Sequence, residues 1–424
     1  MIALLIILFI ICLIFRFPIA FALGFSCLIY ILFKGIPLVI IPAKMYSGID
    51  VFVLLSIPGF ILAGNLMNQG GLTEKIIAFC NHIVGHIRGG LALANIGTSM
   101  LFAGISGTAI SDTASIGTIM IPSMKKEGYG AGFSCAVTAS SSTVGPIIPP
   151  SVPMIIAATL SGLSVGKLFL AGAIPGLMLG VGMMAVAWYI SRKRNYPKHP
   201  KSTFRQMAGS FVDTFWALLM TFIILFGIIG GIFTPTEASI IAVIYALIIG
   251  VFVYGKLNLK NITSVIMDSM KTSASLMVLV GFANLFGWIL ITERFPQVIS
   301  EGITGFSQNK YVVLLLINLL LIFIGTFMET IAALLVLFPI LLKVAVTVGV
   351  DPIHFAVIAV LNLIIGLTTP PVGVCLFVSA SIGKVSIGKV SRASLPFLSV
   401  SLFVLILVTL FPELSLLLPG WLMD

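Results

Sequence analysis

Apolar segments long enough to cross a lipid bilayer follow one another along almost the whole chain, starting with MIALLIILFIICLIF at residues 1–15. Of the 424 residues, 59% are hydrophobic and only 8% are charged, which is too little polar surface for a soluble domain. A spanning helix takes about 20 residues, so the chain has room for roughly ten or more crossings. The runs are continuous rather than alternating, which argues against a membrane barrel. The sequence therefore predicts an all-α polytopic membrane protein.

The basic residues are scattered through short connections, with one dense cluster in the middle of the chain. That cluster comprises Arg192, Lys193, Arg194, Lys198, Lys201 and Arg205. Because cytoplasmic loops of membrane proteins are enriched in Lys and Arg, the cluster predicts that the linker 191–206 is cytoplasmic. The net charge of +10 forms no basic stripe with stacking aromatics, so we expect no nucleic-acid partner.

The two halves of the chain repeat each other. VGPIIPPSVP (144–153) matches IGLTTPPVGV (365–374), which places Gly145 on Gly366 at a spacing of 221 (366 − 145). LTEKI (72–76) matches ITERF (291–295), and Gly104 matches Gly325. Two acids also correspond in spacing, because Asp112 stands ten residues before Pro122 and Glu329 ten before Pro339. A collinear series of this kind indicates a duplication.

The second half shows the order of elements more clearly. We expect spans at 207–233 and 235–254, an amphipathic stretch, and a third span near 274–291. The segment 311–343, broken by GTFMET, suits a re-entrant hairpin of two half-helices, as does 88–126 in the first half. Two interrupted spans follow, at about 350–381 and 391–415.

Each half then makes five crossings, three before its hairpin and two after it. An odd number inverts the second half relative to the first. The charges agree with this: with the linker inside, Arg88 and Lys126 at the ends of the first hairpin fall inside, whereas Lys310 and Lys343 at the second fall outside. The prediction is two inverted-topology repeats, with both termini on the external side.

The irregular segments come as two matched pairs: the hairpin tips AGISGTAISD and IGTFMET, and the broken spans TVGPIIPP and GLTTPP. Irregular backbone at membrane depth is tolerated where it lines a cavity inside the protein. Prolines free carbonyl groups, and these, together with Ser and Thr hydroxyls, can replace the hydration shell of Na⁺. Asp112 and Glu329 at the tips either contact the cation or solute, or cap their half-helices.

The runs GISGTAISDTASIGTIMIPSM, GPIIPPSVPMI and GLTTPPVGVCL resemble the large membrane subunit of tripartite ATP-independent periplasmic (TRAP) transporters over essentially the whole chain. The resemblance implies a Na⁺-driven, elevator-type importer of small carboxylated solutes in a bacterial inner membrane. It also implies two partners, a small four-helix membrane subunit and a periplasmic substrate-binding protein. On this basis 1–87 and 207–309 are scaffold with arm helices, and 88–190 and 310–424 form the mobile transport domain.

The resemblance also implies sites for at least two Na⁺. The first sodium site would use Ser106, Thr108, Gly145, Ile148 and Pro150. The second would use Gly325, Thr326, Met328, Gly366, Thr369 and Pro371. The solute would lie between the tips, near Asp112, Ser141, Ser142 and Asn362.

Three alternatives remain open. Gly104-Ile105-Ser106-Gly107 fits the G-x-S-G pattern of an intramembrane serine hydrolase, although no histidine is expected to reach Ser106. A stand-alone Na⁺/dicarboxylate elevator carrier would share the fold but need no binding protein. The solute itself is open between a C4-dicarboxylate and a sugar acid such as sialic acid, and overall resemblance favours the sugar acid.

Overall fold

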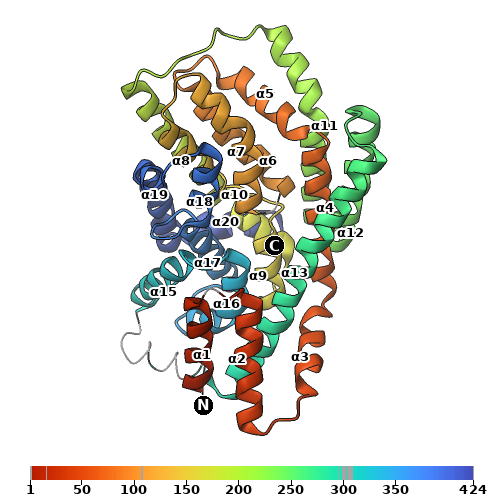
Figure 1. Ribbon diagram of the computed structural model, residues 1–424, viewed down its shortest axis with the longest axis vertical. Helices are drawn as coiled ribbons and strands as arrows, with labels where there is room; N and C mark the ends of the chain where they lie inside the picture. The colour runs from red at the N-terminus through yellow and green to blue at the C-terminus, as the bar shows by residue number, and fades with distance from the viewer. Residues whose placement is uncertain are drawn as a thin grey trace.

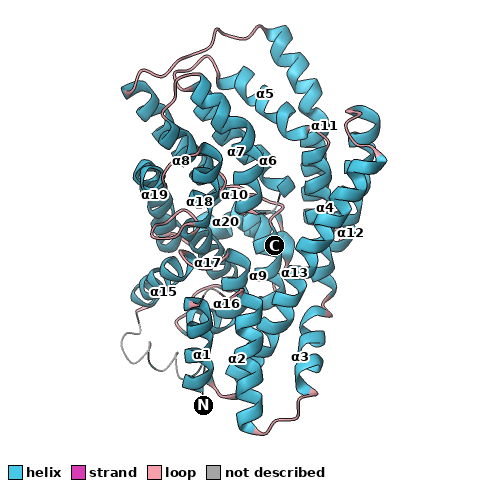
Figure 2. Ribbon diagram, viewed as in Figure 1, coloured by secondary structure: helices cyan, strands magenta, loops and turns pink. Residues whose placement is uncertain are grey.

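The computed structural model describes residues 2–15, 17–106, 108–295, 297, 302 and 309–423, and the described part is helical without strands (Figures 1 and 2). In the first half the helices are α1 (Ile2–Ile14), α2 (Ile19–Lys34), α3 (Ile40–Ile49), η1 (Phe52–Leu55), α4 (Ser56–Gln69), α5 (Leu72–Val84), α6 (Gly90–Ser106), α7 (Ala109–Lys126), α8 (Ala131–Ser141), α9 (Val152–Ser161) and α10 (Val165–Lys193). In the second half they are α11 (Phe204–Ile229), α12 (Pro235–Ile248), η2 (Ile249–Val253), α13 (Leu259–Thr292), α15 (Lys310–Gly325), α16 (Thr330–Thr347), α17 (Pro352–Gly366), α18 (Val374–Gly383), α19 (Ile387–Leu410) and α20 (Glu413–Leu422). Seven described helices are long and apolar enough to span a membrane, which confirms a polytopic helical protein.

The duplication is visible in the helix boundaries. The second arms of the two hairpins, α7 and α16, have 18 residues each and are offset by 221 at both ends (330 − 109 and 347 − 126). After the broken spans the offset becomes 222, since α9 begins at Val152 and α18 at Val374. The extra residue lies in the second break, where Gly373 takes the left-handed conformation at φ 59°.

The first hairpin, α6 and α7, begins and ends on one face of the molecule. At its start the Gly89 amide donates to the Pro197 carbonyl (3.2 Å), and Arg88 donates to Asn195 (2.7 Å). At its end Glu127 lies 3.0 Å from the His199 ring nitrogen. The linker after α10 therefore holds both ends of this hairpin, which is re-entrant as predicted. We call this side the linker face.

The second hairpin, α15 and α16, begins and ends on the other side. Lys310 at its start and Gly349 just after its end line one small cavity together with Thr409. Thr409 belongs to the far end of α19, whereas just before the start of this helix the Lys125 ammonium donates to the Gly383 carbonyl at the linker face (2.9 Å). The 24 residues of α19 span roughly 36 Å. The two hairpins thus open towards opposite faces, as Figure 1 shows.

Two ion pairs relate the halves reciprocally. Lys34 of the first half pairs with Glu293 of the second (2.7 Å), and Lys256 of the second pairs with Glu74 of the first (2.5 Å). The lysines are offset by 222 and the glutamates by 219 (256 − 34, 293 − 74). Reciprocal contacts of this kind are expected of a two-fold related pair of repeats. The glutamates belong to the matched LTEKI and ITERF segments.

Two asparagine–serine hydrogen bonds between the packed helices show the same reciprocal arrangement. Asn65 of α4 donates to Ser269 of α13 (2.9 Å), and Asn284 of α13 donates to Ser47 of α3 (3.4 Å). The asparagines are offset by 219 and the serines by 222 (284 − 65, 269 − 47). α13 therefore packs along its length against α3 and α4, which lie beside it in Figure 1.

Two boundaries differ from the sequence predictions. The amphipathic stretch and the third span of the second half form one continuous helix, α13, because its 34 residues contain no proline and Asn258 caps its start. In the first half the equivalent path is broken between α3 and α4, next to Pro58. The last span, predicted as interrupted over 391–415, is a single helix that continues past Pro396 and ends only before Pro412.

Candidate functional site

The first hairpin tip places a hydroxyl at the start of a helix. Thr108 is the N-cap of α7, and its Oγ1 accepts a hydrogen bond from the Ser111 amide (3.4 Å). N-cap hydroxyls satisfy amides that lack a partner within the helix. Ser106 ends α6 in the backbone, but its side chain lies outside the described part of the structure, as does Gly107. Of the two tip hydroxyls expected at the first sodium site, only that of Thr108 is placed.

Asp112 lies one turn inside α7 and is completely buried, with an exposed fraction of 0%. Its Oδ2 is so close to Gly145 that a Cβ on this glycine would lie 2.3 Å from it. Gly145 belongs to the first broken span, between α8 and α9. The carboxylate therefore rests against unwound backbone, and Asp112 is not the cap of its helix.

In the first break a carbonyl group is left without its helical hydrogen bond. Pro149 has no N–H to donate to the Gly145 carbonyl four residues before it, and the Pro149–Pro150 peptide is cis. Ser151 restarts the helix, because its hydroxyl accepts from the Met154 amide (3.2 Å) and donates to the Pro146 carbonyl. Ile148 packs against Gly176 of α10. These contacts fix the shape of the break around the Gly145 carbonyl.

The second tip meets the second break through backbone alone. A Cβ on Gly366 would lie 2.5 Å from the Gly325 carbonyl carbon, so the ends of α15 and α17 touch where neither residue has a side chain. The Gly373 amide donates to the Thr326 carbonyl (3.3 Å), which ties the tip to the loop after the break. Met328 is buried beside them, with 6% exposed.

Two threonines lie next to this junction in the chain, Thr326 directly after Gly325 and Thr369 three residues after Gly366. Thr326 donates its proton to the Phe323 carbonyl (2.8 Å), and Thr369 donates to Ile365 (2.9 Å). A hydroxyl that donates within its own helix still offers two lone pairs. Pro371, next to Thr369 and after the cis Pro370–Pro371 peptide, is exposed.

Glu329 acts as a helix cap. Its carboxylate accepts hydrogen bonds from the amides of Ile331 (2.9 Å) and Ala332 (3.2 Å) at the start of α16. Its counterpart at the 221-residue offset is Thr108, the cap of α7, and the counterpart of Asp112 is Ala333. Pairing the two acids by their distance to a proline was wrong by one helical turn, because Pro122 and Pro339 are only 217 apart (339 − 122).

Three further residues expected near the solute are buried and hydrogen-bonded, two of them to a neighbouring helix. Ser141 of α8 accepts a hydrogen bond from Ser99 of α6 (2.9 Å), and Ser142 donates to the carbonyl of Thr138 in its own helix (2.7 Å). Asn362 of α17 donates to Asn318 of α15 at both its side-chain (2.7 Å) and main-chain (3.0 Å) oxygens.

Ser141 and Asn362 are offset by 221 (362 − 141), so in both halves the first arm of the hairpin is bonded to an equivalent position of the helix that follows the hairpin. Sequence reasoning missed their partners Ser99 and Asn318. A polar residue inside the long apolar run YVVLLLINLLL was the available signal for Asn318.

Three of the four histidines are engaged away from the first tip. His82 contacts Ser202 (2.9 Å), and His354 contacts Ser415 (2.7 Å) at the opposite end of the molecule. His199 is held by Glu127 at the linker face. These contacts leave none of the three positioned as a base for a serine at the first tip.

Known proteins match the chain over nearly its full length. The family model described as the DctM component of the tripartite ATP-independent periplasmic transporter matches residues 6–414. The sialic acid TRAP transporter large permease protein SiaM of Vibrio cholerae is 42% identical, covering 95% of this chain and 94% of its own. The C4-dicarboxylate TRAP transporter large permease protein DctM of Pseudomonas aeruginosa is 40% identical, covering 89% of both chains.

Among solved structures, the Alcanivorax borkumensis YdaH transporter is similar in fold, with a TM-score of 0.63 at 15% sequence identity over 90% of this chain and 88% of the other. The relatives are transport permeases, which removes the serine hydrolase alternative. The two inverted hairpins, the matched breaks and these comparisons lead to one conclusion: the chain belongs to the DctM family and is a large membrane subunit of a TRAP transporter.

Proposed function

We propose that the chain couples the import of a small carboxylated solute to the entry of Na⁺ by an elevator mechanism. In this proposal the two hairpins and the two broken spans carry the solute and ions across the membrane as one unit. The paired helices of residues 1–87 and 207–309 stay in place and guide them. The observation that carries the proposal is the facing of two hairpin tips and two proline breaks inside the membrane part.

Sodium coupling is supported by the oxygen atoms at these two junctions. Na⁺ is a hard cation and prefers oxygen ligands. In the first site we assign the carbonyl of Gly145 and the hydroxyl of Thr108, with Ser106, Ile148 and Pro150 completing the set and Asp112 adding a negative charge beside it. In the second site the ligands are carbonyls and hydroxyls of Gly325, Thr326, Met328, Gly366, Thr369 and Pro371, without a carboxylate at the position of Asp112.

The orientation follows from the distribution of lysine and arginine. The linker face carries the dense basic cluster of residues 192–205, whereas the opposite face has fewer basic residues near its helix ends. We therefore infer that the linker face is cytoplasmic, that both termini are periplasmic, and that the membrane is the bacterial inner membrane.

The partners and solute come to this chain from its relatives. A small four-helix membrane subunit and a periplasmic binding protein would complete the transporter. Since one relative is named for sialic acid and another for C4-dicarboxylates at nearly equal identity, the proposal extends to the shared chemistry, a small carboxylated acid, with sialic acid preferred.

The test is uptake in proteoliposomes that contain the chain with its candidate partners. Uptake driven by an inward Na⁺ gradient, lost when K⁺ replaces Na⁺, and dependent on the binding protein is the expected result. Na⁺-driven uptake without the binding protein would instead identify a stand-alone carrier. Uptake that is unchanged in K⁺ would refute the coupling.

A further inference from the structure

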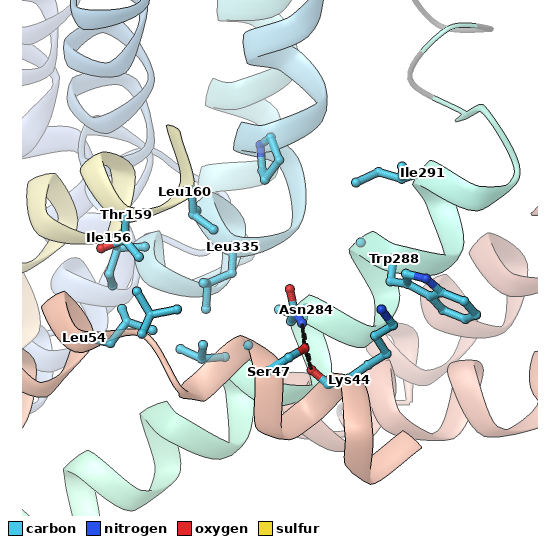
Figure 3. Close-up of a pocket in the computed structure, with 16 residues that line it drawn as sticks. Lys44, Ser47, Leu54, Ile156, Thr159, Leu160, Asn284, Trp288, Ile291 and Leu335 are labelled. Atoms are coloured by element: carbon cyan, nitrogen blue, oxygen red, sulfur yellow. Dashed lines mark hydrogen bonds between the residues drawn. The ribbon is translucent and has the colours of Figure 1, made fainter. Parts of the chain in front are cut away.

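A cavity of about 440 Å³ lies away from both tips, between two pairs of helices. One wall is made by α3 and α13, and the other by α9 and α16 (Figure 3). Its volume lies in the range of small-molecule sites. Ile291 lines it only two residues before Glu293, which pairs with Lys34, so the cavity lies near the face opposite the linker face.

Lys44 is the charged residue of this cavity. Its side chain is half-buried, and its ammonium lies 5.4 Å from the centre of the Trp288 ring. Among the residues that the structure describes, no carboxylate lies within 4.0 Å of it, whereas Lys34, Lys75 and Lys256 all have acidic partners. A charged group that is partly buried in a largely apolar cavity without an acidic partner is unfavourable by itself, which makes Lys44 a functional-site candidate.

The helix packing fixes where this lysine stands. Asn284 donates to the Lys44 carbonyl (2.7 Å), and a Cβ on Gly48 would lie 2.4 Å from the Asn284 Cβ. α3 and α13 therefore touch at Gly48, and the turn that bears Lys44 is tied to α13. Figure 3 shows Lys44, Ser47 and Asn284 together on this wall, with Leu335 and Thr159 across the cavity.

The two-fold relation between the repeats shows that the scaffold does not require this charge. The offset of 222 that relates Lys34 to Lys256 and Ser47 to Ser269 places Ile266 at the position equivalent to Lys44 (266 − 44). The same packing of α13 against its neighbours is thus made with an apolar residue in the other repeat. A lysine therefore stands at this position in one repeat and not in the other.

We propose that this cavity is an outer binding station for the carboxylate group of the transported solute, with Lys44 as its anchoring cation. The inference rests on the proposed function, in which this face receives the solute. Under that proposal, Lys44 lies on the stationary wall, and the facing wall belongs to the mobile part. The station would hold the anion before the hairpins take it up, and the Lys44 ammonium would donate charge-assisted hydrogen bonds to it.

The first test needs neither a known solute nor Na⁺. All five native cysteines are buried, so Ser47→Cys places one reactive thiol on the cavity wall. In the full-length transporter in lipid nanodiscs, we expect this thiol to react about tenfold faster with the anionic reagent sulfonatoethyl methanethiosulfonate than with its trimethylammonium analogue. Lys44→Met should remove the preference and Lys44→Arg should keep it.

Lys310→Met is the matched control, because this lysine also lies over an aromatic ring (Tyr311, 5.0 Å) at the same face but does not line the cavity. It should leave the preference unchanged. Equal rates for the two reagents in Ser47→Cys, or a preference that survives Lys44→Met, would overturn the anion site.

The second test places the cavity on the solute's path. In uptake of N-acetylneuraminate or succinate, whichever the reconstituted transporter carries, Lys44→Met should raise KM about tenfold or more while the Na⁺ concentration for half-maximal uptake stays unchanged. An unchanged KM together with the reagent preference would refute the solute role. Na⁺-independent uptake with a raised KM would instead refute only the sodium coupling.

Discussion

The two hairpin tips occupy equivalent places in an inverted repeat and yet are built differently. The first brings a buried carboxylate, Asp112, against the unwound backbone at Gly145, and caps its helix with the neutral Thr108. The second has Ala333 in place of the buried acid, caps its helix with Glu329, and joins tip to break by direct contact of Gly325 and Gly366.

The two proposed cation sites therefore offer different chemical groups. A carboxyl group lies beside the first junction, so Na⁺ binding at the first proposed site should depend on the charge of Asp112. The second junction has carbonyl and hydroxyl oxygens and a tight backbone contact, so it should depend on geometry. Four sets of substitutions test how the two repeats differ, in order of falling effect.

The largest effect is expected at the backbone contact of the second tip. Gly366→Ala places a Cβ 2.5 Å from main-chain atoms of Gly325, and main chain cannot rotate away as a side chain can. We expect a loss of about 3 kcal/mol in stability, measured as a lower midpoint of thermal unfolding in detergent. Gly145→Ala meets a movable carboxylate oxygen and should destabilise less. Gly388→Ala, with open space around it, is the control. Equal midpoints for Gly366→Ala and Gly388→Ala would contradict the contact.

The second substitution compares the two acids. Asp112→Asn should raise the Na⁺ concentration for half-maximal uptake by roughly 10- to 100-fold, because a charge-assisted contact is lost. Glu329→Gln should lower stability by about 1 kcal/mol through loss of the cap, with little change in the Na⁺ response. Uptake measured against Na⁺ concentration separates the two. The opposite order of effects would show that the cap, and not the buried acid, serves the cation.

The third substitution tests the neutral ligands of the second site. Thr369→Val removes a hydroxyl that is one of the proposed ligands and should weaken the Na⁺ response about fivefold, the effect of one neutral hydrogen-bonding group. Thr368→Val is the matched control, since Thr368 donates to the same Ile365 carbonyl (3.0 Å) but is not among the proposed ligands. If both valine variants respond to Na⁺ alike, the assignment of Thr369 fails.

The smallest effect concerns the reciprocal ion pairs. Hydrogen bonds from Lys34 and then from Tyr30 lower the pKa of Glu293. A lowered pKa in the folded state means that the stabilisation is present above the ordinary glutamate value of about 4.3 and is lost as the pH falls through the lowered value.

Below about pH 5 the thermal midpoint should therefore fall less steeply in Glu293→Gln than in the unchanged protein. The ion pair contributes no more than about 1 kcal/mol to stability, because it is partly exposed. Glu74→Gln removes the more exposed equivalent (60% against 22% for the two glutamate side chains) and should change less. A larger change of the thermal midpoint below pH 5 in Glu74→Gln than in Glu293→Gln would contradict this ranking.

Much of the architecture could be predicted because its signals are local. Hydrophobic runs, the paired prolines after Gly145 and Gly366, and the basic linker all act through short-range chemistry. The re-entrant hairpins followed from the length of two interrupted segments, and the inversion followed from the odd number of crossings that remains in each half. The continuity of α13 could not be predicted from the sequence. An amphipathic stretch followed by an apolar span can form two helices or, when no proline separates them, one helix.

The site was predictable in outline but not in its contacts. The matched tips and breaks were identified, but the two acids were equated although one caps a helix and the other is buried one turn inside. A slip of four residues on a helix keeps the same face, so the pattern alone could not reveal it. Lys44 was not predicted as a site residue, because the sequence around an isolated lysine shows neither a cavity nor the absence of an acidic partner.

From the sequence it could be predicted that this chain spans a membrane in two inverted copies, with a tip and a break in each, because helix length, proline and charge act along the chain itself. The contacts of Asp112 with Gly145 and of Gly325 with Gly366, and the pairing of Lys34 and Lys256 with the other repeat's glutamate, became known from the folded structure. Those contacts join residues far apart in the chain, and their distances depend on how the helices pack.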